Sequence, residues 1–161
     1  MAKFDQTDLE ILNLLQEDAQ LTIKELAAKL GLTSTPIFER IKNLEKRGVI
    51  DRYVAILNPQ KLGKKLNAFI QISIKDHGSL AIDNLVKHVT GFPEVLECHH
   101  LTGDADILLK VVVDDIEQYN YFMLKKLSRV ANIGQIKTNF SIAVRKYTTA
   151  FTLNLDTMKR Q

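Results

Sequence analysis

The stretch Ile23–Ile50, IKELAAKLGLTSTPIFERIKNLEKRGVI, decides how the first part of this chain folds. Its apolar residues recur with helical spacing in two runs, and Gly31 separates the runs. Thr22, just before the stretch, and Glu25 within it have the spacing of a capping box, which opens a helix, whereas Gly31 can adopt the positive φ that ends one. The stretch therefore predicts two short helices joined by a tight turn.

The second of these helices, predicted over residues 33–47, has one apolar and one polar side. At about 100° per residue, Ile37, Ile41 and Leu44 fall on a single face. The polar side carries Thr35, Glu39, Lys42, Asn43 and Lys46, and Arg40 and Arg47 lie along its edge. This is the pattern of a helix-turn-helix, a motif that places its second helix in the major groove of DNA. The alternative is a three-helix bundle whose charged side is simply solvated.

Side-chain chemistry divides the polar residues of this helix into two groups. Asn43 suits adenine and Glu39 suits cytosine, so we expect them, together with Thr35, to contact base edges. We expect the arginine and lysine residues to contact phosphates, which position a protein without specifying a sequence. The predicted DNA-contacting residues are Thr33, Ser34, Thr35, Glu39, Arg40, Lys42, Asn43, Lys46 and Arg47.

The segments around this motif complete a first domain. Thr7 is the expected N-cap of a preceding helix that ends near Asp18. After the motif, β-branched and aromatic residues predict a strand over residues 49–57. The predicted organisation is a helix-turn-helix domain at residues 1–51, a strand and linker at residues 52–65, and a second domain at residues 66–161.

The composition is that of an ordinary globular protein, with 45% hydrophobic and 25% charged residues among 161. The chain contains no apolar run of the roughly 20 residues that a membrane span needs, and its first residues lack a signal-peptide pattern. Cys98 is the single cysteine, which suits a reducing compartment. We therefore expect a cytoplasmic protein that contacts no membrane.

Positive charge gathers around the helix-turn-helix. The net charge of the chain is only +3, but residues 24–65 hold ten Lys or Arg and four acidic residues, whereas residues 1–23 hold one Lys and five acidic residues. A basic region of this kind fits a phosphate-binding surface, and it also fits a solvated helix face.

From residue 66 the apolar pattern changes its period. Residues 66–74 alternate as a half-buried strand does. The elements predicted after it are a helix capped by Ser79, strands over 94–101 and 106–113, a helix capped by Asp114 and Asp115, a strand from Gly134 to about Val144, and an edge strand over 147–155. The order β-α-β-β-α-β is that of a ferredoxin-like α+β fold, which places both helices on one face of an antiparallel sheet.

The other face of this sheet is expected to carry Phe69, Leu101 and Phe140. Apolar side chains of this size are unfavourable in water, so we expect a second copy of the chain to cover them. A homodimer also suits the first domain, since paired recognition helices reach successive turns of the major groove.

Motifs in both domains carry a resemblance to a known family. They are Asp8 with Ile11-Leu12, Glu25-Leu26, Gly31-Leu32, Thr35-Pro36, Glu39-Arg40, Leu44-Glu45, Gly48-Val49-Ile50, Asn58-Pro59, Glu97-Cys98-His99 and Gly103-Asp104-Ala105-Asp106. In this order and spacing the chain resembles the leucine-responsive regulator/asparagine regulator (Lrp/AsnC) family over nearly its whole length. The resemblance implies a winged helix-turn-helix before the ferredoxin-like domain, in a sequence-specific transcription regulator that is not an enzyme. It also implies dimers that assemble into octamers, with an amino-acid effector bound between subunits.

The family's effector loop corresponds here to Thr102, Gly103, Asp104, Ala105 and Asp106, and Thr138 corresponds to a position that faces the effector from a neighbouring subunit. Backbone groups of a glycine turn, together with a carboxylate, can grip an α-amino acid, with Asp104 or Asp106 at its ammonium group. Ala105 departs from the family pattern, in which an aromatic residue is common. The alternative for this loop is a tight hairpin that needs Gly103 and is capped by the two Asp side chains.

Other reactive side chains form no recognised site. His99 and His100 point to opposite faces of a strand, and Cys98 with His100 supplies only two ligands, so we expect no metal site. We also expect no cofactor besides the amino-acid effector. The functional alternatives are a ligand-independent architectural DNA-binding protein of the same fold and a regulatory domain of an amino-acid enzyme, although the first sixty residues lack a nucleophile or an acid–base set.

Overall fold

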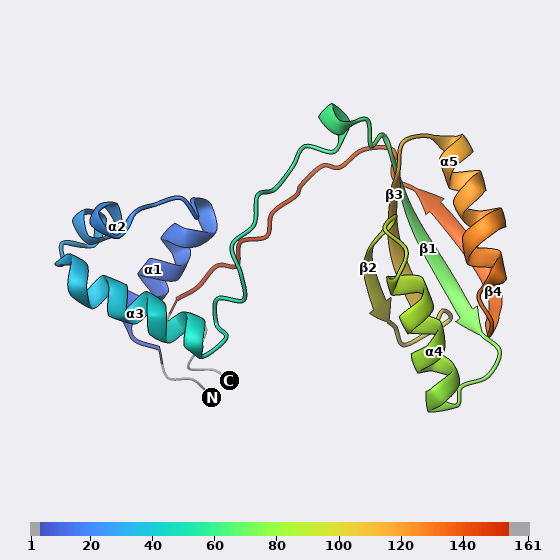
Figure 1. Ribbon diagram of the computed structural model, residues 1–161, viewed down its shortest axis with the longest axis horizontal. Helices are drawn as coiled ribbons and strands as arrows, with labels where there is room; N and C mark the ends of the chain where they lie inside the picture. Colours follow the sequence, from blue (N-terminus) through green and yellow to red (C-terminus); the bar gives the residue numbers. More distant parts are fainter. Residues whose placement is uncertain (1–3, 155–161) are drawn as a thin grey trace. The chain divides into compact units, whose positions relative to one another are not determined.

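A computed structural model describes residues 4–154, which form two compact units (Figure 1). One unit comprises residues 57–145, and the other comprises residues 4–56 together with the returning segment 146–154. The returning segment belongs to the predicted second domain by sequence position but contacts the first unit. The rest of that predicted domain, residues 155–161, lies outside the described residues.

The first unit contains three helices, α1 (Gln6–Glu17), α2 (Ile23–Leu30) and α3 (Ser34–Lys46). The capping box predicted for α2 is present: the Thr22 hydroxyl accepts from the backbone N–H of Glu25, and the Glu25 carboxylate accepts from that of Thr22. Gly31 ends α2 with φ of 65°. The helices bury a common core of Ile11, Leu12, Leu26, Ala27, Ile37, Ile41 and Leu44. The apolar face predicted for α3 is therefore confirmed.

Helix α1 begins at a different cap from the predicted one. Asp5 accepts a hydrogen bond from the backbone N–H of Asp8 at 2.9 Å, and Asp8 accepts one from the backbone N–H of Asp5 at 3.3 Å. Thr7, the predicted N-cap, lies inside the first turn. The pair of carboxylates satisfies two free N–H groups and places negative charge at the positive end of the helix.

The strands predicted on either side of the second unit are absent. Residues 49–57 and residues 147–154 are not paired as strands with any other segment of the described chain, and Leu155, the last residue of the predicted edge strand, lies outside it. β-branched and aromatic residues favour a strand only where a partner strand accepts their backbone hydrogen bonds.

The returning segment binds α1 through side chains instead. Asn13 donates to the carbonyl oxygen of Leu153 at 3.0 Å. Gln16 donates to the carbonyl oxygen of Phe151 at 3.1 Å and accepts from the N–H of the same residue at 2.7 Å. Leu153 also packs against the core of the first unit.

The second unit has the predicted β-α-β-β-α-β order. Its elements are β1 (Leu66–Ile74), α4 (Ser79–Thr90), β2 (Val95–His100), β3 (Ile107–Val113), α5 (Ile116–Tyr121) and β4 (Ile133–Phe140). A π-helical turn, Phe122–Lys126, and a 3-10 turn, Leu127–Arg129, continue α5, and another 3-10 turn, Gln60–Leu62, precedes β1. The strands pair antiparallel in the order β2-β3-β1-β4, which confirms the ferredoxin-like arrangement.

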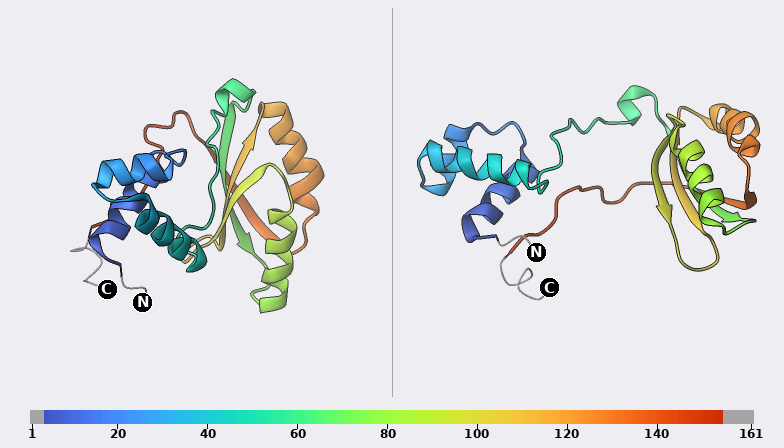
Figure 2. Two further views of the ribbon diagram at one scale, coloured as in Figure 1. Left: turned by 60° about the vertical axis from the view of Figure 1, so that its left-hand side comes forward. Right: turned by 60° about the horizontal axis from the view of Figure 1, so that its bottom comes forward.

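Helices α4 and α5 lie on one face of this sheet (Figure 2). Alternate residues of β1 and β3 point into the core beneath them, and the core residues of the two strands are Ala68, Ile70, Ile72, Ile74, Ile107, Leu109, Val111 and Val113. The intervening residues, among them Phe69, point to the opposite face, which we call the open face. The open face is the surface that the sequence predicts a second copy to cover.

Three details of the prediction for this unit are wrong. Phe140 pairs with Ala68, so it lies on the helix side, where its ring meets that of Tyr119 edge-on at 4.8 Å. Strand β4 ends at Phe140 rather than near residue 144, and Gly78 rather than Ser79 is the N-cap of α4. The Asp115 cap of α5 is confirmed by its hydrogen bond from the backbone N–H of Gln118. In residues 4–154, no helix combines the length and apolar character that a membrane span requires.

Candidate functional site

The residues predicted to contact DNA lie on the outer side of α3 and at its two ends. Thr33 is the N-cap and Arg47 the C-cap. Unlike Asp5 and Thr22 in the other two helices, Thr33 makes no capping hydrogen bond through its side chain within the described chain. The exposed members of the set are Thr33, Ser34, Thr35, Glu39, Lys42, Asn43, Lys46 and Arg47.

Arg40 differs from the other members of the set because it is half-buried and held by α1. Its guanidinium lies 2.6 Å from the Asp5 carboxylate and 2.7 Å from the Asp8 carboxylate. Hydrogen bonds to Asp8 and Asp5 raise the pKa of Arg40 above its ordinary value. Arg40 therefore joins the recognition helix to the N-terminal turn of α1, a structural role that the sequence pattern had not indicated.

Lys42 is also engaged within the unit. Its ammonium group lies 2.7 Å from the Glu45 carboxylate, and the Tyr53 hydroxyl donates to the same carboxylate at 3.2 Å. The hydrogen bond from Lys42 lowers the pKa of Glu45. The Lys42 side chain remains exposed over 59% of its surface, so this pairing does not remove it from solvent.

Phe38 is a surface residue of α3 that the sequence analysis did not select. It is 49% exposed, and the Lys42 ammonium lies 5.9 Å from its ring centre. Phe38 lines a hollow of the first unit together with Leu15, Leu21 and Tyr53, so it lies beside the outer side of α3 rather than among its polar residues. The sequence contained a signal for its exposure: Phe38 follows Ile37 by one residue, so helical periodicity places it outside the apolar face of α3.

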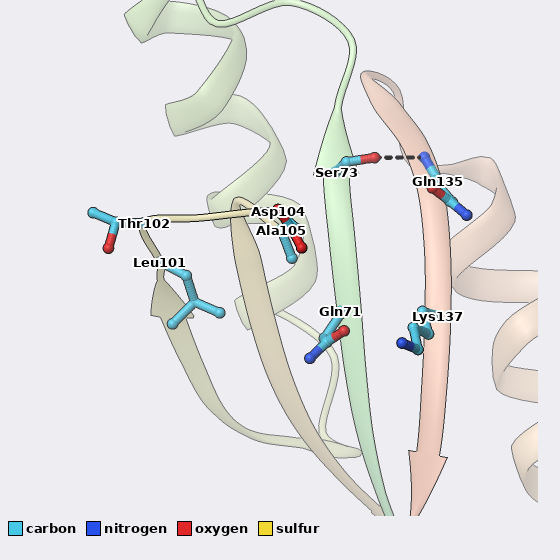
Figure 3. A pocket seen from close by; sticks show the side chains of 8 residues that line it. All are labelled: Gln71, Ser73, Leu101, Thr102, Asp104, Ala105, Gln135 and Lys137. Carbon is cyan, nitrogen blue, oxygen red and sulfur yellow. Dashed lines mark hydrogen bonds between the residues drawn. The ribbon is translucent and has the colours of Figure 1, made fainter.

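The second candidate site is an open pocket on the open face of the sheet (Figure 3). Its volume is about 530 Å³, within the range of roughly 300–1,000 Å³ that small-molecule sites occupy. The lining residues are Gln71, Ser73, Leu101, Thr102, Asp104, Ala105, Gln135 and Lys137. They come from β1, β4 and the turn between β2 and β3, so the fold assembles them from three separate parts of the sequence.

The turn between β2 and β3 supplies three of the six predicted effector residues to this pocket: Thr102, Asp104 and Ala105. Gly103 lies between them with φ of 113°, a conformation that an L side chain rarely adopts. Its substitution would strain the turn, although a Cβ atom there would meet open space.

Asp106 belongs to the same turn but does not line the pocket. Its carboxylate accepts the backbone N–H of Ile74 at 2.8 Å and lies 3.3 Å from the His77 ring. The hydrogen bond from Ile74 lowers the pKa of Asp106. Of the two carboxylates predicted to meet an ammonium group, Asp104 faces the pocket and Asp106 anchors the turn to β1.

Thr138 lies on the helix side of β4 rather than at the pocket. It pairs with Ile70, a core residue, and its hydroxyl accepts from the Tyr119 hydroxyl at 2.7 Å. Its neighbour Lys137 points to the open face instead. Thr138 therefore does not line the pocket of its own subunit, because neighbouring residues of a strand point to opposite faces of the sheet. Its predicted contact with an effector bound at a neighbouring subunit stays a prediction.

Sequence reasoning missed the pocket residues that lie on the sheet. These are Gln71 and Ser73 of β1, Gln135 and Lys137 of β4, and Leu101 after β2. The signal was present in β4, where polar Gln135 and Lys137 alternate with the apolar Ile136. The strand pairing that brings β4 beside β1 was not visible in the pattern of either strand alone.

The side chains of Cys98, His99 and His100 do not converge on one site in the structure. Cys98 is half-buried against the core, where burial raises the pKa of its thiol. His99 lies 3.2 Å from Glu97, which also pairs with Lys110 at 2.6 Å. No group of three or more metal-ligating side chains occurs within residues 4–154.

Two family models match the chain. Residues 67–151 match the Lrp/AsnC ligand binding domain, and residues 4–51 match a winged helix-turn-helix DNA-binding domain. The first match covers the pocket and all of the sheet except Leu66, and the second covers α3 and the helices that support it.

Individual relatives match over nearly the full length. The chain is 38% identical over 151 residues to the glutamate uptake regulatory protein of Zymomonas mobilis, covering 94% of this chain and 92% of that protein. It is 36% identical over 146 residues to the DNA-binding transcriptional activator DecR of Escherichia coli, covering 91% and 96%.

Solved structures agree with these matches. A transcriptional regulator of Neisseria meningitidis in complex with L-Met superposes with a TM-score of 0.90 at 34% identity, covering 94% of this chain and 98% of the other. An AsnC family regulator of Agrobacterium tumefaciens gives 0.89 at 39% identity, covering 96% and 99%.

Proposed function

The chain belongs to the Lrp/AsnC family of DNA-binding transcription regulators, and we propose that it binds DNA through the outer side of α3 and an amino acid in the pocket beside the 102–105 turn. The observation that carries the proposal is the pairing, in one chain, of an exposed polar recognition helix with a polar pocket on a sheet. A regulator needs both, since one part reads DNA and the other responds to a signal.

On the DNA side, Thr35, Glu39 and Asn43 are the proposed base-reading residues. They are exposed on the outer side of α3 and carry groups that pair with base edges. The proposed phosphate contacts come from Lys42, Lys46, Arg47 and the hydroxyls of Thr33 and Ser34. Arg40 is reassigned to positioning the helix, because both of its carboxylate partners lie within the first unit.

On the effector side, the proposed ligand is an α-amino acid, and the proposed partner of its ammonium group is Asp104, which lines the pocket. Support comes from the match to a ligand binding domain and from the Neisseria meningitidis regulator, which was solved with L-Met. Thr102 and Ala105 complete the turn side of the pocket, and Gly103 gives the turn its shape.

Self-association is proposed through the open face of the sheet. Phe69 is 37% exposed there, and Leu101 lies at the pocket on the same face. A second copy would cover Phe69 and close over the pocket, so that the bound amino acid would lie between the two subunits. A homodimer would also pair two recognition helices for two half-sites of a symmetric operator. Further assembly of dimers to an octamer, with effector sites between subunits, is proposed from the family alone.

The experiment that tests this function selects DNA with the full-length protein. Fragmented genomic DNA is incubated with the protein, the bound fraction is sequenced, and the selection is repeated with each of the twenty amino acids. The expected result is an enriched motif with two-fold symmetry whose occupancy changes with at least one amino acid. Selective binding that no amino acid alters would instead indicate a ligand-independent architectural protein, and non-selective binding would contradict sequence-specific regulation.

A further inference from the structure

The lining of the pocket is unusual for a site that would hold an apolar amino acid. Its apolar side chains are Leu101 and Ala105, and the other lining residues are polar or charged. Small-molecule sites usually have mostly apolar walls with a few polar groups. An aliphatic side chain would find little apolar surface to pack against here, and it would form no hydrogen bonds with the polar lining.

Two of the polar residues carry opposite charges and are not paired with each other. Neither the Asp104 carboxylate nor the Lys137 ammonium has a hydrogen bond or ion pair to any residue between 4 and 154. Both are exposed in the open pocket. A ligand that brings a cation to Asp104 and an anion to Lys137 would satisfy both groups with charge-assisted hydrogen bonds.

The sheet topology separates these two charges. Lys137 lies on β4, directly across from Gln71 of β1, whereas Asp104 belongs to the turn that leads into β3. Because β1 lies between β3 and β4, their backbones are two strand spacings apart, or roughly 9–10 Å. The charges are therefore placed to meet opposite ends of a ligand rather than its adjacent α-ammonium and α-carboxylate groups.

Two amides lie beside Lys137. Gln71 is its cross-strand partner, and Gln135 is the next residue of β4 on the same face. Figure 3 shows Gln71 and Lys137 beside each other on the neighbouring strands. The backbone N–H of Gln135 donates to the Ser73 hydroxyl, and the side-chain amide of Gln135 has no hydrogen bond within the described chain. Both amides can therefore donate to a ligand oxygen.

We propose that the pocket selects an α-amino acid with an acidic or amide side chain: Asp104 binds the α-ammonium, and Lys137 with Gln71 and Gln135 binds the side-chain carboxylate or amide. This inference rests on the proposed amino-acid effector function and narrows its ligand class. A carboxylate side chain forms charge-assisted hydrogen bonds with the Lys137 ammonium, whereas an amide side chain forms only neutral ones. Glutamate therefore binds more tightly than glutamine. Leucine and methionine bind more weakly than either.

Calorimetric titration of the full-length protein with L-glutamate, L-glutamine, L-leucine and L-methionine tests this order. Glutamate and glutamine should bind at least about tenfold more tightly than leucine and methionine, since only their side chains form hydrogen bonds with Lys137 and the two amides. Tighter binding of leucine or methionine would overturn the ligand class while leaving amino-acid sensing intact. If none of these four binds, and none of the other sixteen amino acids binds in the same titration, both the ligand class and amino-acid sensing are overturned.

Two variants locate the contacts. Lys137→Met keeps most of the length of the side chain but removes its charge. The affinity for glutamate should therefore fall by about tenfold or more, and the affinity for glutamine by less. Asp104→Asn should lower the affinities for glutamate and for glutamine by the same factor, because both ligands carry the same α-ammonium group. Lys87→Met, at an exposed position of α4 away from the pocket, is the matched control and should leave all affinities unchanged. If Lys137→Met lowered the affinities for glutamate and glutamine by the same factor, the assignment of Lys137 to the side chain of the ligand would be overturned.

Discussion

The Arg40 guanidinium lies 2.7 Å from the Asp8 carboxylate, and this contact joins the middle of the recognition helix α3 to the first turn of α1. Asp8 is the one buried charged residue of the described chain, with 8% of its surface exposed. Its carboxylate also closes the capping box of α1. A single buried carboxylate thus fixes the start of one helix and the orientation of another.

Replacement of Asp8 by Asn should therefore destabilise the first unit. The variant removes the carboxylate charge of residue 8, so the half-buried Arg40 guanidinium keeps only Asp5 as an ion-pair partner. The free energy of unfolding should therefore fall by about 1–3 kcal/mol. Urea unfolding followed by circular dichroism measures it. Glu17→Gln, at an exposed position of the same helix, is the control. A loss no larger than that of the control would show that the contact adds little stability.

The salt dependence of DNA binding should separate phosphate contacts from positioning contacts. Lys46 is exposed on the outer side of α3, so Lys46→Met should reduce the slope of log K against log salt by about 0.9 per site. Arg40→Met should weaken binding through the altered helix orientation and leave the slope unchanged. Fluorescence anisotropy between 50 and 300 mM salt, concentrations chosen around the usual working range of about 0.15 M, gives both quantities. An equal drop in slope for the two variants would mean that Arg40 contacts phosphate in the complex.

Substitution of a base-reading residue should change the sequence preference of DNA binding more than its overall affinity. Asn43→Ala should relax the preference at one base pair of each half-site by about 1–3 kcal/mol while leaving the salt slope unchanged. Competition with operators that differ by single base pairs measures this preference. If Asn43→Ala weakened binding uniformly to every operator, the residue would be a backbone contact.

Stability at low pH should depend on Asp5. The hydrogen bond from the Asp8 N–H, and then the contact with Arg40, hold the pKa of Asp5 below its ordinary value. Because the folded pKa is the lower one, the stabilisation is present above the unfolded pKa and is lost as pH falls through the folded pKa. The melting temperature of the first unit should therefore fall below about pH 4.

Asp5→Asn provides the comparison, since asparagine keeps a capping oxygen but cannot be protonated in this range. Its melting temperature should be lower than that of the parent at pH 7 and should approach it as the pH falls towards 3. Parallel pH curves for the two proteins would contradict this contribution of Asp5.

The returning segment should be held to α1 by side-chain hydrogen bonds. Asn13→Ala removes the donor to Leu153, so the free energy of unfolding should fall by about 0.5–1.5 kcal/mol. Amide hydrogen exchange near residues 151–153 should increase in Gln16→Ala, which loses both bonds to Phe151. Gln20→Ala, at an exposed position after α1, is the control. Unchanged exchange in Gln16→Ala would show that the apolar contact of Leu153 suffices.

Much of the fold could be predicted because local patterns report local structure. The capping box at Thr22 and Glu25, the turn at Gly31 and the apolar stripe of α3 each depend on residues within seven positions of one another. The alternation in β1 was equally local. The predictions failed where the structure of a segment depends on a partner distant in sequence. Residues 49–57 pair with no strand of the described chain, and Arg40 binds two carboxylates more than thirty positions earlier.

The candidate sites divide in the same way. The sequence by itself determined the polar side of α3 and the turn at Gly103, since helical periodicity and backbone conformation are local properties. Only the tertiary structure decided that Lys137 rather than Thr138 faces the pocket, that Asp104 faces it while Asp106 anchors the turn, and that Gln71 lies beside Lys137. The physical reason is that strand pairing and register, which depend on contacts between β1, β3 and β4, assign each side chain to one face of the sheet.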